Sequence, residues 1–224
     1  MNSFNIFLIL IFILSSVAFF FYRRAKRKGE VLESLNMTLF LVMMPKYDQK
    51  NDELMKKEEK DLIAHMEQVY ANFLSLREPN FFRRIMRGQP RVAFEIASQT
   101  GGSDIAFYVA VPKNLKGSFE KYINGVYPGA VVEAIPKDYT IFEPKNINVG
   151  AYLRLESAAV LPITTYKNLE KDPLASITNA LSKIAKDEGA AMQIVIRPFP
   201  QGEWRRIGYQ LLDKIKRGKT VHTA

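Results

Sequence analysis

The C-terminal tail contains three residues that are typical of a phosphate-binding loop. Gly218, Lys219 and Thr220 match the second half of the P-loop pattern, in which a glycine and four further residues precede Gly-Lys-Ser/Thr. The pattern also requires a strand before the loop and a helix whose N-terminal end faces the phosphate. Position 213 is Asp213 instead of the required glycine, a helical pattern precedes the triplet, and four residues follow it. We interpret the triplet as part of a basic tail, residues 218–224.

Other residue types that carry out catalysis are scarce in this chain. It has no cysteine and only two histidines, His65 in a predicted helix and His222 in the tail. Without cysteine there are no disulfides, thiolate metal ligands or cysteine nucleophiles. No Gly-x-Gly-x-x-Gly pattern follows a predicted strand. The sequence therefore predicts no catalytic residue, no cofactor and no metal site, and we do not expect an enzyme.

One stretch combines cationic and aromatic side chains in a pattern that suits binding. Residues 77–91 read REPNFFRRIMRGQPR, and the side chains of interest are Phe81, Phe82, Arg83, Arg84 and Arg87. Such a mixture can bind phosphates and stack on bases, lie on a bilayer surface or dock a protein partner. A short connecting helix that packs its phenylalanines under a sheet is the remaining alternative. The sequence leaves all four open.

The positive charge is concentrated at the two ends of the chain. The formal net charge is +9, of which residues 1–28 contribute +5, residues 197–224 contribute +5 and the middle contributes −1. The C-terminal group includes Arg205 and Arg206. Nucleic-acid binding relies on many cations that neutralise phosphates, so the near-neutral middle disfavours it. A membrane-tethered nucleic-acid binder that uses residues 77–91 and 205–219 is therefore the alternative hypothesis.

The N-terminal stretch predicts a membrane anchor. Residues 4–22 carry no charge, and 14 of them are Phe, Ile, Leu or Val. As a helix this stretch would be about 28 Å long, close to the hydrocarbon thickness of a bilayer. No cation precedes it and bulky residues follow its apolar core, unlike a cleaved signal peptide. We predict an uncleaved, single-pass transmembrane helix.

The charges that follow the apolar stretch predict its orientation. The stretch is followed at once by Arg23, Arg24, Lys26, Arg27 and Lys28. By the positive-inside rule the N-terminus lies outside and residues 23–224 lie in the cytoplasm, at the inner or plasma membrane. These cations also suit contact with anionic membrane lipid, although orientation alone accounts for them. Residues 23–34 are expected to form a basic juxtamembrane linker.

Hydrophobic periodicity predicts an α+β sandwich over residues 35–137. Expected elements, in order, are a strand at 36–45, a helix at 58–77, a hairpin at 91–112 that turns at Gly101 and Gly102, a helix at 114–129 and a strand at 130–136. This β-α-β-β-α-β order is that of ferredoxin-like folds, in which two helices cover one face of a four-stranded sheet.

A second α/β block is predicted over residues 148–217. Its expected elements are a strand at 150–163, a helix at 172–189, a buried strand at 190–198 and a helix at 202–218. The apolar residues of the last helix, expected to face inward, are Trp204, Ile207, Leu211, Leu212 and Ile215. The block has too few strands for a complete second unit. It either extends the first sheet or forms a partial repeat.

Five segments in this order resemble a known family: GQPRVAFEIAS, IAFYVAVPKNL, INGVYPGAVVEAI, LPITTYKNLEKDPL and DPLASITNALSKIAKDEGAAMQIVIRP. Over roughly residues 35–199 the chain resembles the N-terminal membrane-anchored region, a family of unknown function, of conjugative-transfer and type IV secretion ATPases. In those proteins a RecA-like motor with the P-loop follows, and this chain stops before such a motor.

The resemblance implies a role but no chemistry for the present residues. ATP hydrolysis is not carried over to any of them, because the matching segments hold structural motifs only. What it implies is a single-pass membrane protein whose cytoplasmic domain tethers or organises a translocation ATPase, in cis or in trans. A homo-oligomer is the other partner expected.

Overall fold

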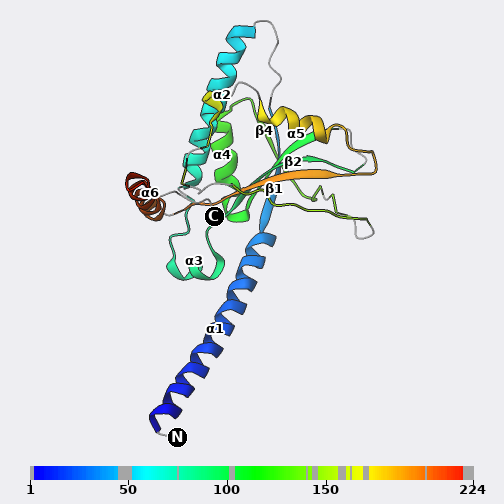
Figure 1. Cartoon of the computed structure of the whole chain (residues 1–224). Coiled ribbons are helices and arrows are strands. Elements are labelled where there is room, and N and C mark those ends of the chain that lie inside the picture. The colour runs from blue at the N-terminus through cyan, green and yellow to red at the C-terminus, as the bar shows by residue number, and fades with distance from the viewer. Residues whose placement is uncertain are drawn as a thin grey trace.

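The protein has a mixed α+β fold. The computed structural model describes residues 3–44, 52–74, 76–100, 104–139, 141–142, 146–155, 160–161, 163–168, 172–199 and 201–218. Within these residues the helices are α1 (Ser3–Leu35), α2 (Asp52–Leu74), α3 (Phe81–Arg87), α4 (Lys116–Val126), α5 (Pro173–Leu181) and α6 (Gln201–Lys216). The strands are β1 (Met37–Met43), β2 (Val92–Ser98), β3 (Ile105–Pro112), β4 (Val131–Ile135) and β5 (Ala190–Ile196) (Figure 1).

The five strands form one antiparallel sheet in the order β4-β1-β3-β2-β5. β1 lies between β4 and β3, with Phe40 opposite Ala134 on one side and Val109 on the other. The predicted order of strands and helices over residues 35–137 is therefore confirmed, with the short helix α3 inserted before β2. The predicted hairpin is formed by β2 and β3, while the turn at Gly101 and Gly102 lies outside the described residues.

The main core lies between one face of the sheet and the helices α2 and α4. Phe40 of β1 and Phe119 of α4 are fully buried, with ring centroids 5.0 Å apart. Phe73 of α2 stacks on Phe119 at 6.3 Å. Figure 1 shows both helices on the same side of the sheet. Successive side chains of a strand point to opposite faces of the sheet. Each strand therefore contributes every second residue to this core.

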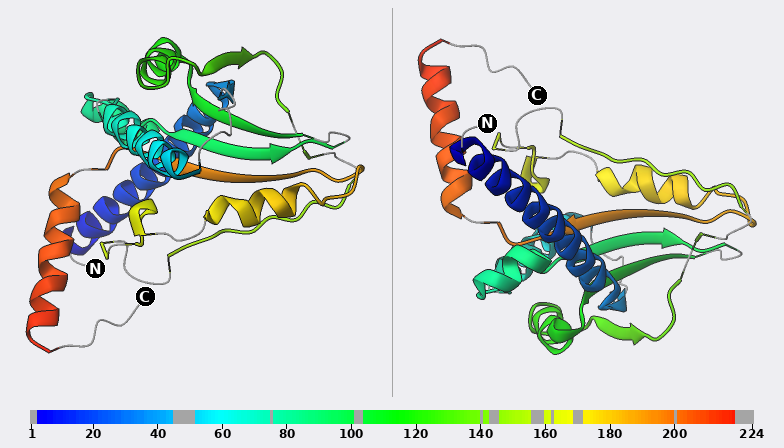
Figure 2. Two further views of the ribbon diagram at one scale, coloured as in Figure 1. Left: turned by 90° about the horizontal axis from the view of Figure 1, so that it is seen from above. Right: turned by 90° about the horizontal axis from the view of Figure 1, so that it is seen from below.

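The second block extends the first sheet and does not form a separate unit. β5 pairs with β2 along its full length, from Val92 opposite Ile196 to Ser98 opposite Ala190. It is an edge strand, and Ile194 and Val195 are about half exposed, so the prediction of a buried strand is wrong. α5 lies alongside β5 (Figure 2). As predicted, Asp172 caps α5, accepting a hydrogen bond from the backbone N–H of Leu174 at 2.8 Å.

The strand predicted at residues 150–163 is wrong over the part that the structure describes. Residues 150–155 belong to no strand, and Tyr152 and Leu153 are almost fully exposed. Their alternation of apolar and polar residues is typical of a strand, but a strand also needs a free partner. The open side of β2 is already taken by β5, which leaves no place beside β2 for this segment.

α1 is one helix that continues through the predicted linker. Residues 23–34, expected to be a linker, extend it to Leu35, because they are rich in Arg, Lys, Glu, Leu and Ala, which favour helix. Figure 1 shows the N-terminal part of α1 projecting from the body, and this part holds residues 4–22, the predicted transmembrane helix. Within the described part of the chain, no helix reaches the combination of length and apolar character needed to cross a membrane.

Candidate membrane-facing and partner-facing surfaces

The P-loop-like triplet does not begin as a phosphate loop. Gly218 has a positive φ of 68°, and its N–H donates to the carbonyl of Ile215, so this glycine ends α6 in the left-handed conformation. Asp213 stands where the loop needs its first glycine and forms an ion pair of 2.8 Å with Arg217. Lys219 and Thr220 lie outside the described residues. A helix precedes the triplet where the motif requires a strand, in agreement with the sequence interpretation.

Two of the predicted cationic groups, residues 23–28 of α1 and the arginines of α3, lie next to each other. The backbone of Gly29 lies so close to α3 that a Cβ added there would be 2.5 Å from the carbonyl oxygen of Met86. α3 is thereby seated directly on the part of α1 that follows the apolar stretch. We call the combined set of cations the cationic collar: Arg23, Arg24, Lys26, Arg27, Lys28, Arg83, Arg84 and Arg87.

Burial distinguishes the two sides of this stretch of α1. Lys26, Gly29, Glu30 and Glu33 are half-buried, and their spacing of three and four residues places them on one helix face. The other collar residues of α1 are exposed, as are Arg83 and Arg87 of α3. The collar therefore presents most of its positive charge to the surroundings and not to the body.

The loop that carries α3 is held by its own polar groups. The Asn80 side chain accepts a hydrogen bond from the N–H of Arg83 at 3.1 Å and caps α3. At the base of the loop, the N–H of Glu78 donates to the Gln89 side chain at 3.0 Å. Gly88, with a φ of 82°, ends the helix. These contacts keep α3 in place without help from the sheet.

The two phenylalanines of α3 do not pack under the sheet. Phe81 is 56% exposed and Phe82 is 77% exposed, and their rings contact each other edge to face at 5.8 Å. The Arg84 guanidinium lies over the Phe81 ring at 5.5 Å. The alternative of a connecting helix with buried phenylalanines is therefore wrong. A helix forms there, but its aromatic side chains face outward among cations.

The third cationic group lies on α6, which stands apart from α3 in Figure 1. Arg205 and Arg206 are exposed like most collar residues, but they lie on α6 and not on α1 or α3. The apolar residues of α6 were expected to face inward, but Trp204, Ile207, Leu212 and Ile215 are all about half exposed. The backbone of Gly208 lies against the side chain of Val160.

We call this apolar set the α6 stripe: Trp204, Ile207, Leu211, Leu212 and Ile215. The spacing of its members places them on one face of the helix. An amphipathic helix normally buries such a face, yet here four of its five residues are about half exposed. The sequence pattern predicted that these residues share a face, but the expectation that the face points inward is wrong.

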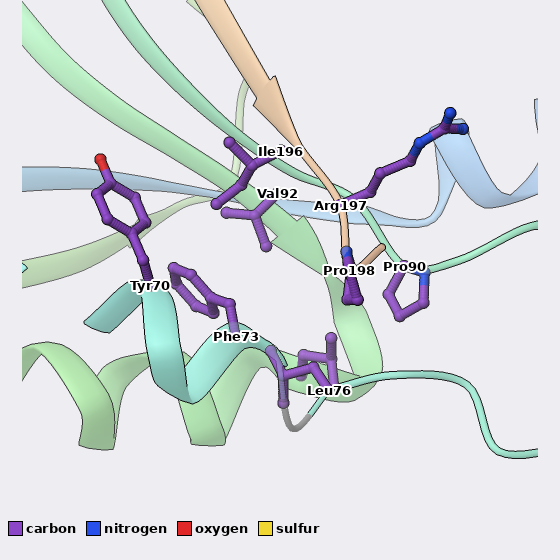
Figure 3. A pocket seen from close by; sticks show the side chains of 9 residues that line it. Tyr70, Phe73, Leu76, Pro90, Val92, Ile196, Arg197 and Pro198 are labelled. Atoms are coloured by element: carbon purple, nitrogen blue, oxygen red, sulfur yellow. The ribbon is translucent and has the colours of Figure 1, made fainter. Parts of the chain in front are cut away.

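The cavity beside the core is too small for a metabolite. It has a volume of about 50 Å³ and lies between α2 and the ends of β2 and β5. In Figure 3 the side chains of Tyr70 and Phe73 rise from α2 on one side of it, and Val92 and Ile196 lie on the strands of the other side. Small-molecule sites usually measure about 300–1,000 Å³. Among the described residues, no three His, Cys, Asp or Glu side chains form a group that could hold a metal ion.

A buried polar cluster on the opposite face of the sheet was not predicted from the sequence. The Glu95 carboxylate is 7% exposed and accepts hydrogen bonds from the Tyr139 hydroxyl at 2.6 Å and the Gln193 amide at 2.7 Å. Tyr139 also stacks on Tyr108 at 4.5 Å. Burial, followed by the hydrogen bond to Glu95, raises the pKa of Tyr139. The available signal was a charged residue between Phe94 and Ile96 of a predicted strand.

This cluster joins parts that are far apart in the sequence. Glu95 belongs to β2 and Gln193 is its direct partner on β5, while Tyr139 follows β4. All three side chains have a partner, so the cluster fixes the added strand and the returning chain to the sheet. We interpret it as a structural element and not as a catalytic one.

The comparisons with known proteins place most of the chain in one family. Residues 48–221 match a Domain of unknown function (DUF8128), which is more than half of the chain. The chain belongs to the DUF8128 family. No curated protein and no solved structure gives a significant match. The DUF8128 match contains α2–α6 and β2–β5, whereas α1 and the interior strand β1 precede it.

Proposed function

We propose that this DUF8128 protein is a non-catalytic adaptor that is tethered to a membrane. In this proposal the apolar part of α1 is held in the bilayer, and the α+β body docks a protein partner at the cytoplasmic surface. The exposed apolar side chains of α1 are the observation that carries the proposal.

These side chains have no partner in the body. Phe12 is 72% exposed and Leu14 is 68% exposed, and the other described large apolar residues of this part are exposed as well. Burying such a side chain contributes about 1.5–3 kcal/mol, so leaving this many in water is unfavourable. The side chains of Phe4, Asn5 and Leu8 are outside the described set, but the complete sequence stretch 4–22 has the length of a bilayer's hydrocarbon layer.

The charges near α1 support one orientation. The five cations of α1 that belong to the collar follow the apolar stretch, and none precedes it. The positive-inside rule then favours a cytoplasmic body and an N-terminus on the other side of the inner or plasma membrane.

The α6 stripe supports a protein partner of defined chemistry. The basic residues of α6 are Arg205, Arg206, Lys214 and Lys216, whereas its acids are Glu203 and Asp213, of which Asp213 pairs with Arg217 just after the helix. A helix with this apolar stripe and these basic residues fits an apolar groove with an acidic rim. The resemblance to the front region of conjugative-transfer and type IV secretion ATPases supports a translocation ATPase as that partner.

The membrane part of the proposal is tested with the full chain in its native host. After an alkaline carbonate wash of isolated membranes, we expect the protein to stay in the pellet. Release into the supernatant would contradict membrane tethering.

The partner part is tested by affinity purification after detergent extraction, with identification by mass spectrometry. We expect recovery of a P-loop ATPase, and loss of that ATPase when Trp204→Ala and Ile207→Ala are combined. Tyr209→Ala is the matched control, because Tyr209 is 71% exposed on the other side of the same helix. Recovery of no ATPase, or equal loss in the control, would argue against docking by the α6 stripe.

We also propose that β1–β4 with α2 and α4 form a ferredoxin-like unit to which β5, α5 and α6 are added. The strand order β4-β1-β3-β2 and the position of both helices on one face support this classification.

A further inference from the structure

The cationic collar and the exposed phenylalanines of α3 lie at a similar height along the axis of α1, just after its apolar stretch. Gly29, the contact point of α3, lies seven residues beyond Tyr22, which corresponds to about 10 Å of helix. In Figure 1 α3 lies at the end of the body from which α1 projects. If α1 enters a bilayer up to Tyr22, α3 lies at the depth of the lipid headgroups, which interfacial helices also occupy.

The charge at this level is strongly positive. Eight cations form the collar, and the acids on the same segments are Glu30, Glu33 and Glu78. Glu78 uses its carboxylate to accept a hydrogen bond from the N–H of Asn80 at 2.9 Å. In the described part of the chain, the ion pairs found involve none of the eight collar residues. Their charge is therefore available to an external anion.

The apolar side chains at this level have the right character for the bilayer interface. Phe81 and Phe82 are exposed beside Arg83 and Arg84, and the aliphatic and guanidinium parts of arginine suit the boundary between acyl chains and headgroups. A surface that combines cations with exposed aromatics binds anionic membranes by charge and by apolar burial together. A partner protein would not need this surface to lie level with the end of the apolar stretch.

We propose that the cationic collar, together with Phe81 and Phe82, binds the anionic phospholipid headgroups of the bilayer that holds α1. This inference rests on the proposed insertion of α1. It makes α3 a second membrane contact, which fixes how the body stands on the surface. The contact should require anionic lipid and should weaken at high salt, because exposed charges are screened.

The test uses the full chain with a single tryptophan at the α3 contact. Trp204 is the only tryptophan, so Trp204→Phe combined with Phe82→Trp gives one reporter. The protein is reconstituted into vesicles of phosphatidylcholine, or of phosphatidylcholine and phosphatidylglycerol in equal parts, with bromine on the acyl chains near the headgroups. We expect fluorescence quenching to be several-fold greater in the anionic vesicles and to fall in high salt.

Charge variants decide whether the collar causes that difference. Combining Arg83→Gln, Arg84→Gln and Arg87→Gln removes three of the eight collar cations and should reduce the difference between the two vesicle types by at least half. The matched control, with the same change in net charge, combines Lys121→Gln, Lys183→Gln and Lys186→Gln at exposed positions on the body. It should keep the difference. Circular dichroism of each variant checks that the body remains folded.

The outcomes separate this inference from the proposed function. Flotation of the protein with both vesicle types tests insertion of α1, and failure to float overturns both proposals. Flotation with equal quenching in the two lipids overturns the collar alone, as does loss of the difference in the control variant. If a short DNA duplex changes the fluorescence and phosphatidylglycerol does not, the surface binds nucleic acid and the lipid assignment is wrong.

Discussion

The unit formed by β1–β4, α2 and α4 buries a cluster of large apolar side chains between its helices and its sheet, whereas the described residues between 146 and 218 leave most of theirs exposed. In the first region Phe40 and Phe119 are fully buried and Phe73 is nearly so. In the second region Tyr152 is fully exposed, and Trp204 and Ile207 are about half exposed. The first region therefore has the contacts of a self-sufficient core, and the second has contacts that suit a partner.

This difference suggests that the two regions of one sheet have different roles, stability for the first and partner contact for the second. The sheet is continuous from β4 to β5, so the second region is not a loosely attached domain. Its polar anchor is the cluster of Glu95, Tyr139 and Gln193, which joins β5 to the unit without much apolar burial. A region fixed in this way can offer apolar surfaces to another protein while the first region supplies the stability.

The largest effect is expected from removing the interior strand β1. A fragment of residues 48–218 lacks β1, which separates β3 from β4 and supplies Phe40 to the core, and it should not fold. A fragment of residues 36–218 and one of residues 36–200, which lacks α6, should both show cooperative unfolding by circular dichroism. Cooperative unfolding of the fragment without β1 would contradict the conclusion that β1–β4, α2 and α4 form the stable core.

A pair of aromatic truncations measures the two regions separately. Phe119→Ala should lower the free energy of unfolding by about 3–5 kcal/mol, because it leaves a cavity in a closed core. Trp204→Ala should change it by no more than about 0.5 kcal/mol, because this side chain is half exposed and packs little. Denaturant titration in detergent gives both values, and similar costs for the two would contradict the difference in packing.

The polar anchor should be weaker than the core but measurable. Tyr139→Phe leaves one Glu95 oxygen without its hydrogen bond in a buried site and should cost about 1–3 kcal/mol of unfolding free energy. Tyr152→Phe is the control, since Tyr152 is fully exposed, and it should have no effect. An equal cost at both positions would mean that the cluster does not anchor the second region.

The same tyrosine predicts the direction of the pH dependence. The pKa of Tyr139 is raised above its ordinary value of 10.0, so above that pH the unfolded chain loses this proton while the folded chain keeps it. Stability should therefore fall as the pH rises above about 10, and this fall should be smaller in Tyr139→Phe. Tyr70 and Tyr127, whose pKa values burial also raises, account for a remaining slope. A slope unchanged by the substitution would contradict this assignment.

The most local effects are expected where single methyl groups are added. Gly29→Ala places a Cβ against the backbone of Met86 and should loosen α3 from α1 at a local cost of about 1–3 kcal/mol. Gly208→Ala meets only the Val160 side chain at 3.1 Å and gains up to about 1 kcal/mol of helix propensity, so it should be neutral or slightly stabilising. Hydrogen exchange of the α3 and α6 amides reports each change, and faster exchange in α6 alone would reverse the expected order.

The sequence predicted the first region well because its elements are locally consistent. Strand alternation in β2 and β3 and helical spacing in α2 each depend on neighbouring residues. The second region was predicted less well because its outcome depends on which edge is free. The alternation at residues 150–155 did not reveal that β5 would take the edge of β2.

The sequence identified the residues of the candidate surfaces but not which of them lie close together in space. The cations at 23–28 and the mixed stretch at 77–91 were both found, yet their union depends on the absence of a side chain at Gly29. The polar cluster depends on Tyr139 returning to the sheet 44 positions after Glu95. Such long-range contacts leave no local pattern in the sequence.

The most direct test of the central claim uses the absence of cysteine from the chain. Single cysteines are introduced by Ser3→Cys before the apolar stretch and by Ser182→Cys after α5, and intact cells are treated with a membrane-impermeant maleimide. We expect labelling at position 3 in intact cells, and labelling at position 182 only after the membrane is opened. Equal labelling of both positions in intact cells, or of neither, would contradict an adaptor that is tethered across the membrane with its body in the cytoplasm.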